Sequence, residues 1–278
     1  MERAREFEYT RRDFDALRRI SNAHTGIIVG DDKFDMFYSR LSKRLRVYGL
    51  RTFAEYVTFL NENPDQEFEQ FINSITTNLT SFFRENHHFE FLRHQLLPEL
   101  VRKNFSSRRI RIWSAGCSTG EEPYSIAMTL KEALVAHRDW DVKVLATDID
   151  SNVLNTAAAG IYPLERASGL SRERLKRWFR KGKGEQTQRV RVHPELREMI
   201  SFRPLNLMGE WPMKGPFDAI FCRNVLIYFD ADTKERLVQR FTELLPPGGH
   251  LFVGHSESLS KVSAGIKLIG NTVYTKQG

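Results

Sequence analysis

The sequence predicts an α/β fold, an open and mainly parallel sheet with helices on both faces, preceded by an all-helical N-terminal region. Three observations predict it. Residues 10–71 show apolar residues at helical spacing and no long alternating run. Beyond residue 108, short β-rich runs alternate with helical patterns, as in parallel sheets. Between residues 168 and 200, a glycine-containing turn joins two strand-like pieces, which indicates a small antiparallel insert.

These patterns divide the chain into two parts, and 278 residues are enough for a medium domain with a smaller satellite. We expect a helical domain over residues 1–75 and an α/β domain over residues 76–278, with the insert near 168–200. Strands are expected at 109–113, 142–146, 217–222 and 250–254, and helices at about 123–137, 150–158 and 231–245. The polar and aromatic stretch from Asn78 is the candidate junction between the domains.

One amphipathic helix is well marked in the helical region. Phe34, Phe37, Leu41 and Leu45 fall on one stripe, and Gly49 offers a natural stop. The other faces carry a concentration of cations, namely Lys33, Arg40, Lys43, Arg44 and Arg46. Such a face is suited to meet an acidic helix of a partner through steering and ion pairing, or it is simply solvated. The sequence leaves both readings open.

Composition narrows the class of protein. No stretch approaches the roughly 18 to 20 apolar residues of a membrane span, and the charged N-terminus lacks the apolar core of a signal peptide. We therefore expect a cytoplasmic protein without membrane insertion, with Cys117 and Cys222 as free thiols. The net charge of +7 favours an anionic partner, which is a nucleic acid, a membrane surface or an acidic protein face, unless the basic surface is merely solvated.

The strongest local signal is a strand that runs into a loop of small residues, Gly116 to Gly120, followed by a helix with Pro123 in its first turn. Glycines at this place let a ligand approach the backbone closely. In a dinucleotide enzyme, the helix amides would face a pyrophosphate. Here Glu121 and Glu122 stand at the helix start, where they would repel a diphosphate. A cationic sulfonium cofactor tolerates them, so the motif favours S-adenosylmethionine.

Polar residues also follow the later strands. Asp148 comes at the end of the second predicted strand, where an acid can accept both hydroxyls of a ribose, and Asp150 or Ser151 is expected to cap the next helix. Asn206 precedes the third strand, and the segment from Asn224 follows it directly. Because ligands of such sheets bind at the carboxyl ends of the strands, we expect these residues to line one crevice.

Together these segments resemble the CheR family of chemotaxis-receptor methyltransferases, over most of the chain up to Gly254. The resemblance rests on four ordered motifs: Asn78-Leu-Thr80-Ser-Phe-Phe-Arg84, Ser118-Thr-Gly-Glu-Glu122-Pro-Tyr-Ser, Thr147-Asp148-Ile-Asp150 and Cys222-Arg-Asn224-Val-Leu-Ile-Tyr228-Phe. It implies a Rossmann-like class I methyltransferase domain with an inserted antiparallel β-subdomain, behind the helical domain. It also implies methylation of glutamate side chains on the cytoplasmic signalling region of chemotaxis receptors for sensory adaptation, with S-adenosylhomocysteine as the second product.

The resemblance also implies site residues. The cofactor contacts would be Asn78, Thr80, Arg84, Glu122, Asp148, Asn206, Leu207, Asn224 and Val225. Arg84 and Tyr228 would lie nearest the transferred methyl group, as the catalytic residues. Members of the family that bind a receptor's C-terminal pentapeptide use the β-subdomain and a glycine-rich loop. This chain has Gly182 and Gly184 there but no further glycine before Arg189, so the sequence leaves binding of a receptor tail open.

Two other functions are open to a chain of this kind. A nucleic-acid methyltransferase would suit the basic charge. However, amino-group methylases of DNA commonly carry an Asn/Asp-Pro-Pro-aromatic motif after the fourth strand, where this chain has Arg223-Asn224-Val-Leu, and neither cysteine follows a proline. A cofactor-binding protein without activity is the second alternative, against which the retained Arg84, Asp148 and Tyr228 speak.

We expect a monomer that binds neither nucleic acid nor a metal. The neighbouring histidines His87 and His88 lie at a helix start, where packing or capping is expected, and no third ligand has suitable spacing. The segment Gly254-His-Ser-Glu-Ser258 holds residue types of a catalytic triad but no nucleophile elbow, so it is read as a loop at a strand end.

Overall fold

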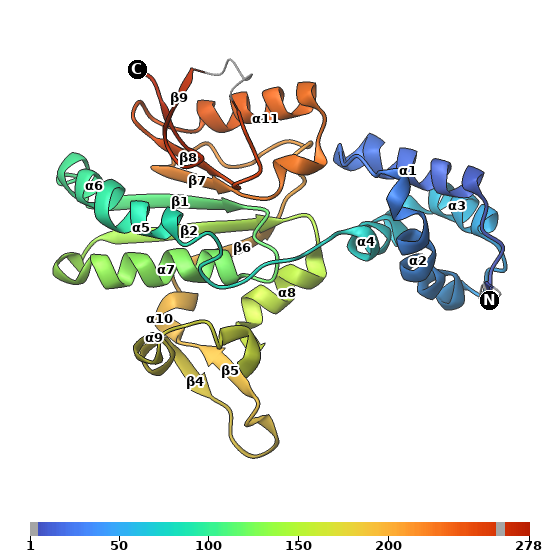
Figure 1. Cartoon of the computed structure of the whole chain (residues 1–278), viewed down its shortest axis with the longest axis horizontal. Helices are drawn as coiled ribbons and strands as arrows, with labels where there is room; N and C mark the ends of the chain where they lie inside the picture. The colour runs from blue at the N-terminus through green and yellow to red at the C-terminus, as the bar shows by residue number, and fades with distance from the viewer. Residues whose placement is uncertain (1–4, 260–264) are drawn as a thin grey trace.

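The structure, a computed structural model, describes residues 5–259 and 265–278. Figure 1 shows a helical domain beside a larger α/β domain, to which an extended segment after α4 connects it. The helical domain is built from α1 (Arg11–Thr25), η1 (Asp31–Lys33), α2 (Phe34–Tyr48), α3 (Phe53–Glu62) and α4 (Pro64–Ile75). No helix in the described ranges has both the length and the apolar character that crossing a bilayer requires.

The helix predicted from Phe34 is confirmed as α2. Phe37, Leu41 and Leu45 are buried on one face of it, and Gly49 ends the helix in a left-handed conformation. The neighbouring helix α1 begins with a capping box, in which the Thr10 hydroxyl and the Asp13 carboxylate satisfy each other's backbone amides. Local sequence therefore sets where these helices begin and end, and the apolar stripe sets which face is buried.

The α/β domain is organised around a sheet that has seven strands in the described residues, in the order β6-β2-β1-β7-β8-β10-β9. Neighbours from β6 to β8 pair in parallel, whereas β10 pairs antiparallel with β8 and β9. The strands are β1 (Arg109–Ala115), β2 (Asp141–Asp148), β6 (Ile200–Pro204), β7 (Ala219–Cys222), β8 (His250–Val253), β9 (Ile266–Gly270) and β10 (Val273–Lys276).

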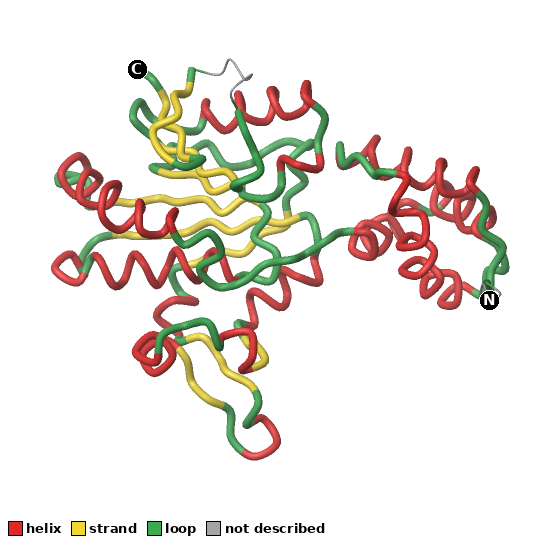
Figure 2. The backbone as a smooth tube through the Cα atoms, viewed as in Figure 1, coloured by secondary structure: helices red, strands yellow, loops and turns green. Residues whose placement is uncertain are grey.

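Helices lie on both sides of the strands, as Figure 2 shows. They are α5 (His87–Phe91), η2 (Leu92–Leu96), α6 (Leu97–Lys103), α7 (Glu121–Ala133), η3 (Val135–His137), α8 (Ser151–Ala159) and α11 (Ala231–Glu243). Side chains that alternate along β1 face two different cores. Ile112 packs in the cluster that contains Met128 of α7, and Trp113 packs in the cluster that contains Phe241 of α11. The predicted open α/β sheet is thus confirmed, with the predicted strands and helices displaced by a few residues at their ends.

The inserted antiparallel unit is also present, and Figure 1 shows it projecting from the α/β domain. Its sheet has the order β3-β5-β4, with β3 (Ile161–Pro163), β4 (Phe179–Lys181) and β5 (Arg189–Val192). The remaining pieces are η4 (Leu164–Ala167), α9 (Arg172–Trp178), η5 (Gly184–Gln186) and α10 (Pro194–Arg197). The sheet begins at Ile161, earlier than the predicted insert near 168–200. A three-residue edge strand that ends in proline gives almost no alternating pattern from which to predict it.

Candidate active site

A cavity lies at the carboxyl ends of β1, β2 and β7, where the helical domain meets the sheet. Figure 1 shows these strand ends on the side of the sheet that faces the helical domain. All ten residues predicted for the site contribute to its wall: Asn78, Thr80, Arg84, Glu122, Asp148, Asn206, Leu207, Asn224, Val225 and Tyr228. The structure thus brings together four motifs that are separated by up to 150 positions in the sequence.

Asp148, the last residue of β2, is the acidic group at the centre of the sheet edge. One carboxylate oxygen accepts the backbone N–H of Ser118 at 2.7 Å, and the other accepts that of Asp150 at 3.0 Å. Burial raises the pKa of Asp148 to about 6 even though these two amides lower it. Because each oxygen has a second acceptor site, a carboxylate held in this way can accept two more donors, such as a pair of ribose hydroxyls.

Asp150 connects the sheet to the segment that leads in from the helical domain. It caps α8 through the backbone N–H of Asn152 at 2.9 Å, which confirms one of the two predicted caps. Its other oxygen accepts the Thr76 hydroxyl at 2.7 Å and the Asn78 amide at 2.8 Å. Asn78 is therefore held in the cavity wall by a buried acid of the α/β domain.

Glu122 lies at the start of α7 and is buried. Its carboxylate accepts the Ser114 hydroxyl at 2.7 Å and the Arg223 guanidinium at 2.9 Å. Burial raises the pKa of Glu122, against the opposing effect of Arg223. Arg223 also donates to the carbonyl oxygen of Arg84 and lies 3.2 Å from the carboxylate of Glu85.

Arg223 is thus a buried cation that joins three loops around the cavity, a role that sequence reasoning missed. The motif Cys222-Arg-Asn224 contained it, but a cation next to a buried strand is no sign of which acids it will meet. Only the fold brings Glu122 and Glu85 to it.

The two candidate catalytic residues both line the cavity. The half-buried Arg84 donates one guanidinium N–H to the carbonyl oxygen of Leu79 at 2.7 Å, so its side chain is anchored within its own loop. Tyr228 ends the short helix η6 (Leu226–Tyr228) and is also half-buried. Its backbone carbonyl accepts the N–H of Ile28 at 2.8 Å, which ties this turn to the helical domain.

Gly116 shows how closely the chain is packed at the wall of the cavity. Its φ is +80°, and a Cβ there would lie 2.4 Å from a methyl carbon of Val225. Glycine at this position therefore lets the chain after β1 pack directly against Val225 in the wall. The acid at the end of β2 and the buried carboxylate of Glu122 fit a cofactor that has a ribose and a positive charge and no phosphate.

The helical domain supplies part of the wall, and this contribution has no counterpart in the sequence analysis. It comes from the end of α1 and the connection after it, from η1 and the start of α2, and from the end of α4. The residues are Thr25, Ile27, Ile28, Val29, Gly30, Lys33, Met36, Phe37 and Ile75. The side chain of Asn206 reaches the last turn of α1, since its amide donates to the carbonyl of His24 at 2.6 Å. The stretch from residue 26 to residue 30 carried no motif, so its place at the cavity is visible only in the fold.

The predicted cationic face of α2 is only partly free. The Arg44 guanidinium forms a bidentate ion pair with the carboxylate of Glu67 on α4, in which Nε donates to Oε1 at 2.8 Å and Nη2 donates to Oε2 at 2.5 Å. The Glu67 side chain is fully buried. The charge of Arg44 is therefore used to neutralise an internal acid, so binding of a partner by Arg44 stays a prediction that competes with this internal pair. Arg40 donates to the carbonyl of Thr76 at 2.6 Å. Lys43 is exposed, and Arg46 is exposed while paired with Glu6.

The two glycines of the β-subdomain loop have different roles. A Cβ at Gly182 would lie 2.1 Å from the carbonyl oxygen of Gln186, so the turn itself requires glycine there. Gly184 has a φ of +55° and no neighbour within 4 Å of a Cβ, so it faces open space at the tip. Neither observation identifies a bound peptide.

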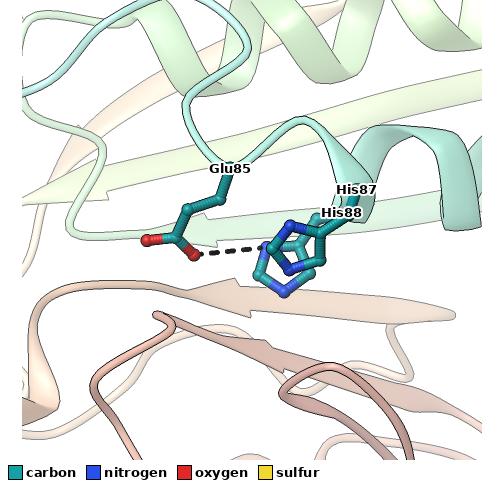
Figure 3. Close-up of side chains that lie close together, drawn as sticks. All are labelled: Glu85, His87 and His88. Atoms are coloured by element: carbon teal, nitrogen blue, oxygen red, sulfur yellow. Dashed lines mark ion pairs between the residues drawn. The ribbon is translucent and has the colours of Figure 1, made fainter.

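Three side chains near Arg84 have the types and spacing of metal ligands, and Figure 3 shows them: Glu85, His87 and His88. Glu85 is thus a third possible ligand, which the sequence analysis did not find beside the two histidines. Burial lowers the pKa of His88 to about 3, so its ring is neutral. Its Nε2 lies 3.1 Å from the carbonyl oxygen of Asn271 and 3.0 Å from the Thr272 hydroxyl. These contacts support the packing role expected for His88.

The fold and the cavity define a class of protein, the S-adenosylmethionine-dependent methyltransferases with a Rossmann-like domain. Comparison with known families then identifies the branch. The chain matches the CheR methyltransferase SAM-binding domain over residues 78–275 and the CheR methyltransferase all-alpha domain over residues 12–76. It belongs to the CheR methyltransferase family, and its cofactor is S-adenosylmethionine.

Two curated relatives are similar to this chain over most of their length. Chemotaxis protein methyltransferase 2 of Pseudomonas aeruginosa is 47% identical over 97% of this chain and 95% of its own length. The chemotaxis protein methyltransferase of Escherichia coli K12 is 48% identical over 93% of this chain and 89% of its own length. The activity of this chain is therefore methylation in chemotaxis, with S-adenosylmethionine as the methyl donor.

Proposed function

We propose that this protein transfers methyl groups to glutamate side chains of chemotaxis receptors and forms methyl esters. The observation that carries the proposal is that Arg84 and Tyr228, a cation and a hydroxyl donor, share one cavity with Asp148 and Glu122. A carboxylate substrate needs such donors, whereas an amino group, which is itself a donor, does not call for an arginine. The names of the relatives support chemotaxis as the setting.

The cofactor side of the cavity is formed by the acids. When bound, S-adenosylmethionine supplies a methyl group on a positively charged sulfur. Asp148 would accept the ribose hydroxyls, since two backbone amides already orient its carboxylate. Glu122 would face the positively charged end of the cofactor, and its own charge is kept in place by Ser114 and Arg223. The proposed contacts are completed by Asn78, Thr80, Arg84, Asn206, Leu207, Asn224 and Val225.

The acceptor side is formed by Arg84 and Tyr228. A glutamate side chain with a pKa of about 4.3 is already ionised at neutral pH, so the chain need not provide a general base. A guanidinium has five N–H donors, and Arg84 uses one of them on Leu79, so others can hold the incoming carboxylate. Tyr228 would donate a hydrogen bond that orients the attacking oxygen. Alignment of this kind is worth roughly 7 to 11 kcal/mol in favourable cases.

Receptor binding is proposed on two surfaces. Lys43 and Arg46 are the exposed cations of α2 that can steer an acidic receptor helix. In the β-subdomain, β4 pairs with β5 on one side and with no other strand of residues 5–259 and 265–278, so its other edge can add a receptor tail as a further strand. Gly182 and Gly184 lie in the loop that follows this edge.

The test is methyl transfer from labelled S-adenosylmethionine to the cytoplasmic fragment of a receptor. Label released as methanol by mild alkali identifies an ester, and we expect Arg84→Ala and Tyr228→Phe to lose transfer while Lys176→Ala, an exposed position on α9, keeps it. Alkali-stable label on nucleic acid would establish the rival methyltransferase instead. Cofactor binding without transfer to any receptor fragment would support the non-catalytic alternative.

A further inference from the structure

The loop after β8, Gly254-His255-Ser256-Glu257, reaches the two loops that carry Arg84 and Tyr228. Its side chains contain residue types of a catalytic triad, yet none of the four residues lines the cavity. Its contacts run instead to the backbone and side chains just behind the cavity wall, in two directions. We call the contacts made by Glu257 the Glu257 arm of this loop, and the contacts made by His255 the His255 arm.

Glu257 holds the loop that begins at Asn224. Its carboxylate is 5% exposed, and one oxygen accepts the backbone N–H of Asn224 at 2.8 Å and that of Gly254 at 2.5 Å. The other oxygen accepts the N–H of Ile227 at 3.1 Å. Asn224 has a φ of +57°, a conformation that is uncommon for a residue other than glycine. Hydrogen bonds to an ionised carboxylate are about twice as strong as neutral ones, so Glu257 stabilises this unusual turn.

Gly254 is the point at which the two loops touch. A Cβ there would lie 2.4 Å from the side-chain nitrogen of Asn224 and 2.9 Å from both its backbone nitrogen and the Glu257 carboxylate. The position has room for a hydrogen atom and no more. The contact between the loops is therefore fixed by sterics as well as by charge.

His255 holds the other loop through Glu85. Its backbone N–H lies 3.1 Å from one carboxylate oxygen of Glu85, and its Nδ1 lies 3.0 Å from the other. Although burial acts to raise it, the pKa of Glu85 falls to about 2 because His255 and Arg223 bind the carboxylate. Glu85 follows Arg84 directly, so its position limits how far the Arg84 backbone can move.

We propose that Glu257 and His255 are positioning residues, which fix the loop of Asn224 and Tyr228 and the loop of Arg84 to one common support. Glu257 supports the residues Asn224 and Val225 of the cofactor side, so it sets cofactor affinity. His255 supports Arg84 on the acceptor side, so it sets turnover. Only the His255 arm rests on the proposed function.

The Glu257 arm is tested without any methyl acceptor. In Glu257→Gln the shape is retained, but one acceptor oxygen becomes an N–H2 group that faces a backbone donor. We expect S-adenosylhomocysteine to bind about tenfold more weakly by calorimetry, and amide exchange in residues 224–227 to speed up while that of β1 is unchanged. Glu235→Gln, an exposed acid on α11, is the control and leaves both unchanged.

Gly254→Ala is the second variant, because its methyl group displaces Asn224 without removing the carboxylate. The same loss of affinity is expected if Glu257→Gln does not fold. Unchanged affinity and unchanged exchange in either folded variant overturns the Glu257 arm, whatever the methyl acceptor proves to be.

The His255 arm is tested with kinetics. His255→Ala is expected to lower kcat about tenfold and S-adenosylhomocysteine affinity by no more than about threefold, because Arg84 is only one of nine proposed cofactor contacts. His255→Asn restores kcat, because its amide nitrogen can replace Nδ1 as the donor to Glu85. A kcat that is unchanged in His255→Ala, or an affinity that falls as far as kcat, refutes this arm.

Discussion

Replacing Arg44 by methionine is predicted to destabilise the helical domain severely, although the residue lies on a face rich in cations. The guanidinium binds both oxygens of Glu67, whose side chain is fully buried. Tyr56 and Tyr48 donate to the same carboxylate at 2.7 and 2.9 Å. Removing the cation leaves a buried charge that two phenols cannot neutralise. Breaking a buried pair from one side costs about 3 to 5 kcal/mol, and we expect that loss for Arg44→Met.

The assay is urea unfolding followed by circular dichroism, with the transition of the helical domain fitted separately from that of the α/β domain. Lys43→Met is the matched control, because this neighbouring cation is exposed and its change should stay within about 0.5 kcal/mol. In a double variant with Glu67→Gln, at least half of the lost stability should return, since no charge remains buried. A loss below 1 kcal/mol for Arg44→Met would refute the reasoning. If the predicted destabilisation is observed, charge reversal at Arg44 is unsuitable as a test of receptor docking, because it would also destabilise the helical domain.

Three further outcomes are expected. Gly116→Ala should weaken S-adenosylhomocysteine binding at least tenfold in calorimetry, because its methyl group would overlap Val225 at 2.4 Å; unchanged affinity would show that this wall yields. Cofactor affinity should fall as pH decreases through about 6, because Asp148 then gains a proton and accepts fewer hydrogen bonds; an equal pH dependence in Asp148→Asn would contradict this. His88 has its pKa lowered to about 3 in the folded state, so its neutral form contributes stability that is complete above pH 6.5 and is lost as pH falls towards 3. The slope attributable to it is at most about 1.4 kcal/mol per pH unit, and acid unfolding of His88→Gln measured in parallel should lack it.

The parts of the site that the sequence predicts well share one property: each lies in a segment whose local pattern is complete in itself. Asp148 follows an apolar strand, and Asp150 stands where a helix must be capped, so both can be placed from a few neighbours. Glu122 stands at the start of a helix behind a loop of small residues. Parallel strands bring their carboxyl ends to one edge, which is why these separate motifs share one cavity.

The features of the fold and the site that the sequence predicts poorly depend on residues far along the chain. Arg44 looks like a surface cation until α4 places Glu67 beside it. Glu257 looks like an ordinary loop residue until the turn at Asn224 presents its amides. The strand β3 is missed because three residues carry too little periodicity to be recognised.

By itself, the sequence determined the class of fold and the position of most helices and strands, because short-range periodicity, capping and turn chemistry encode these features. Through their resemblance to a known family, four ordered motifs also predicted the cofactor and ten residues of the cavity wall. The tertiary structure alone decided which charges are free. Arg44 and Arg223 are neutralised by acids 23 and 101 positions away, and no local pattern records a contact over such separations. The contribution of the helical domain to the cavity was decided in the same way, because it arises only when the two domains pack together.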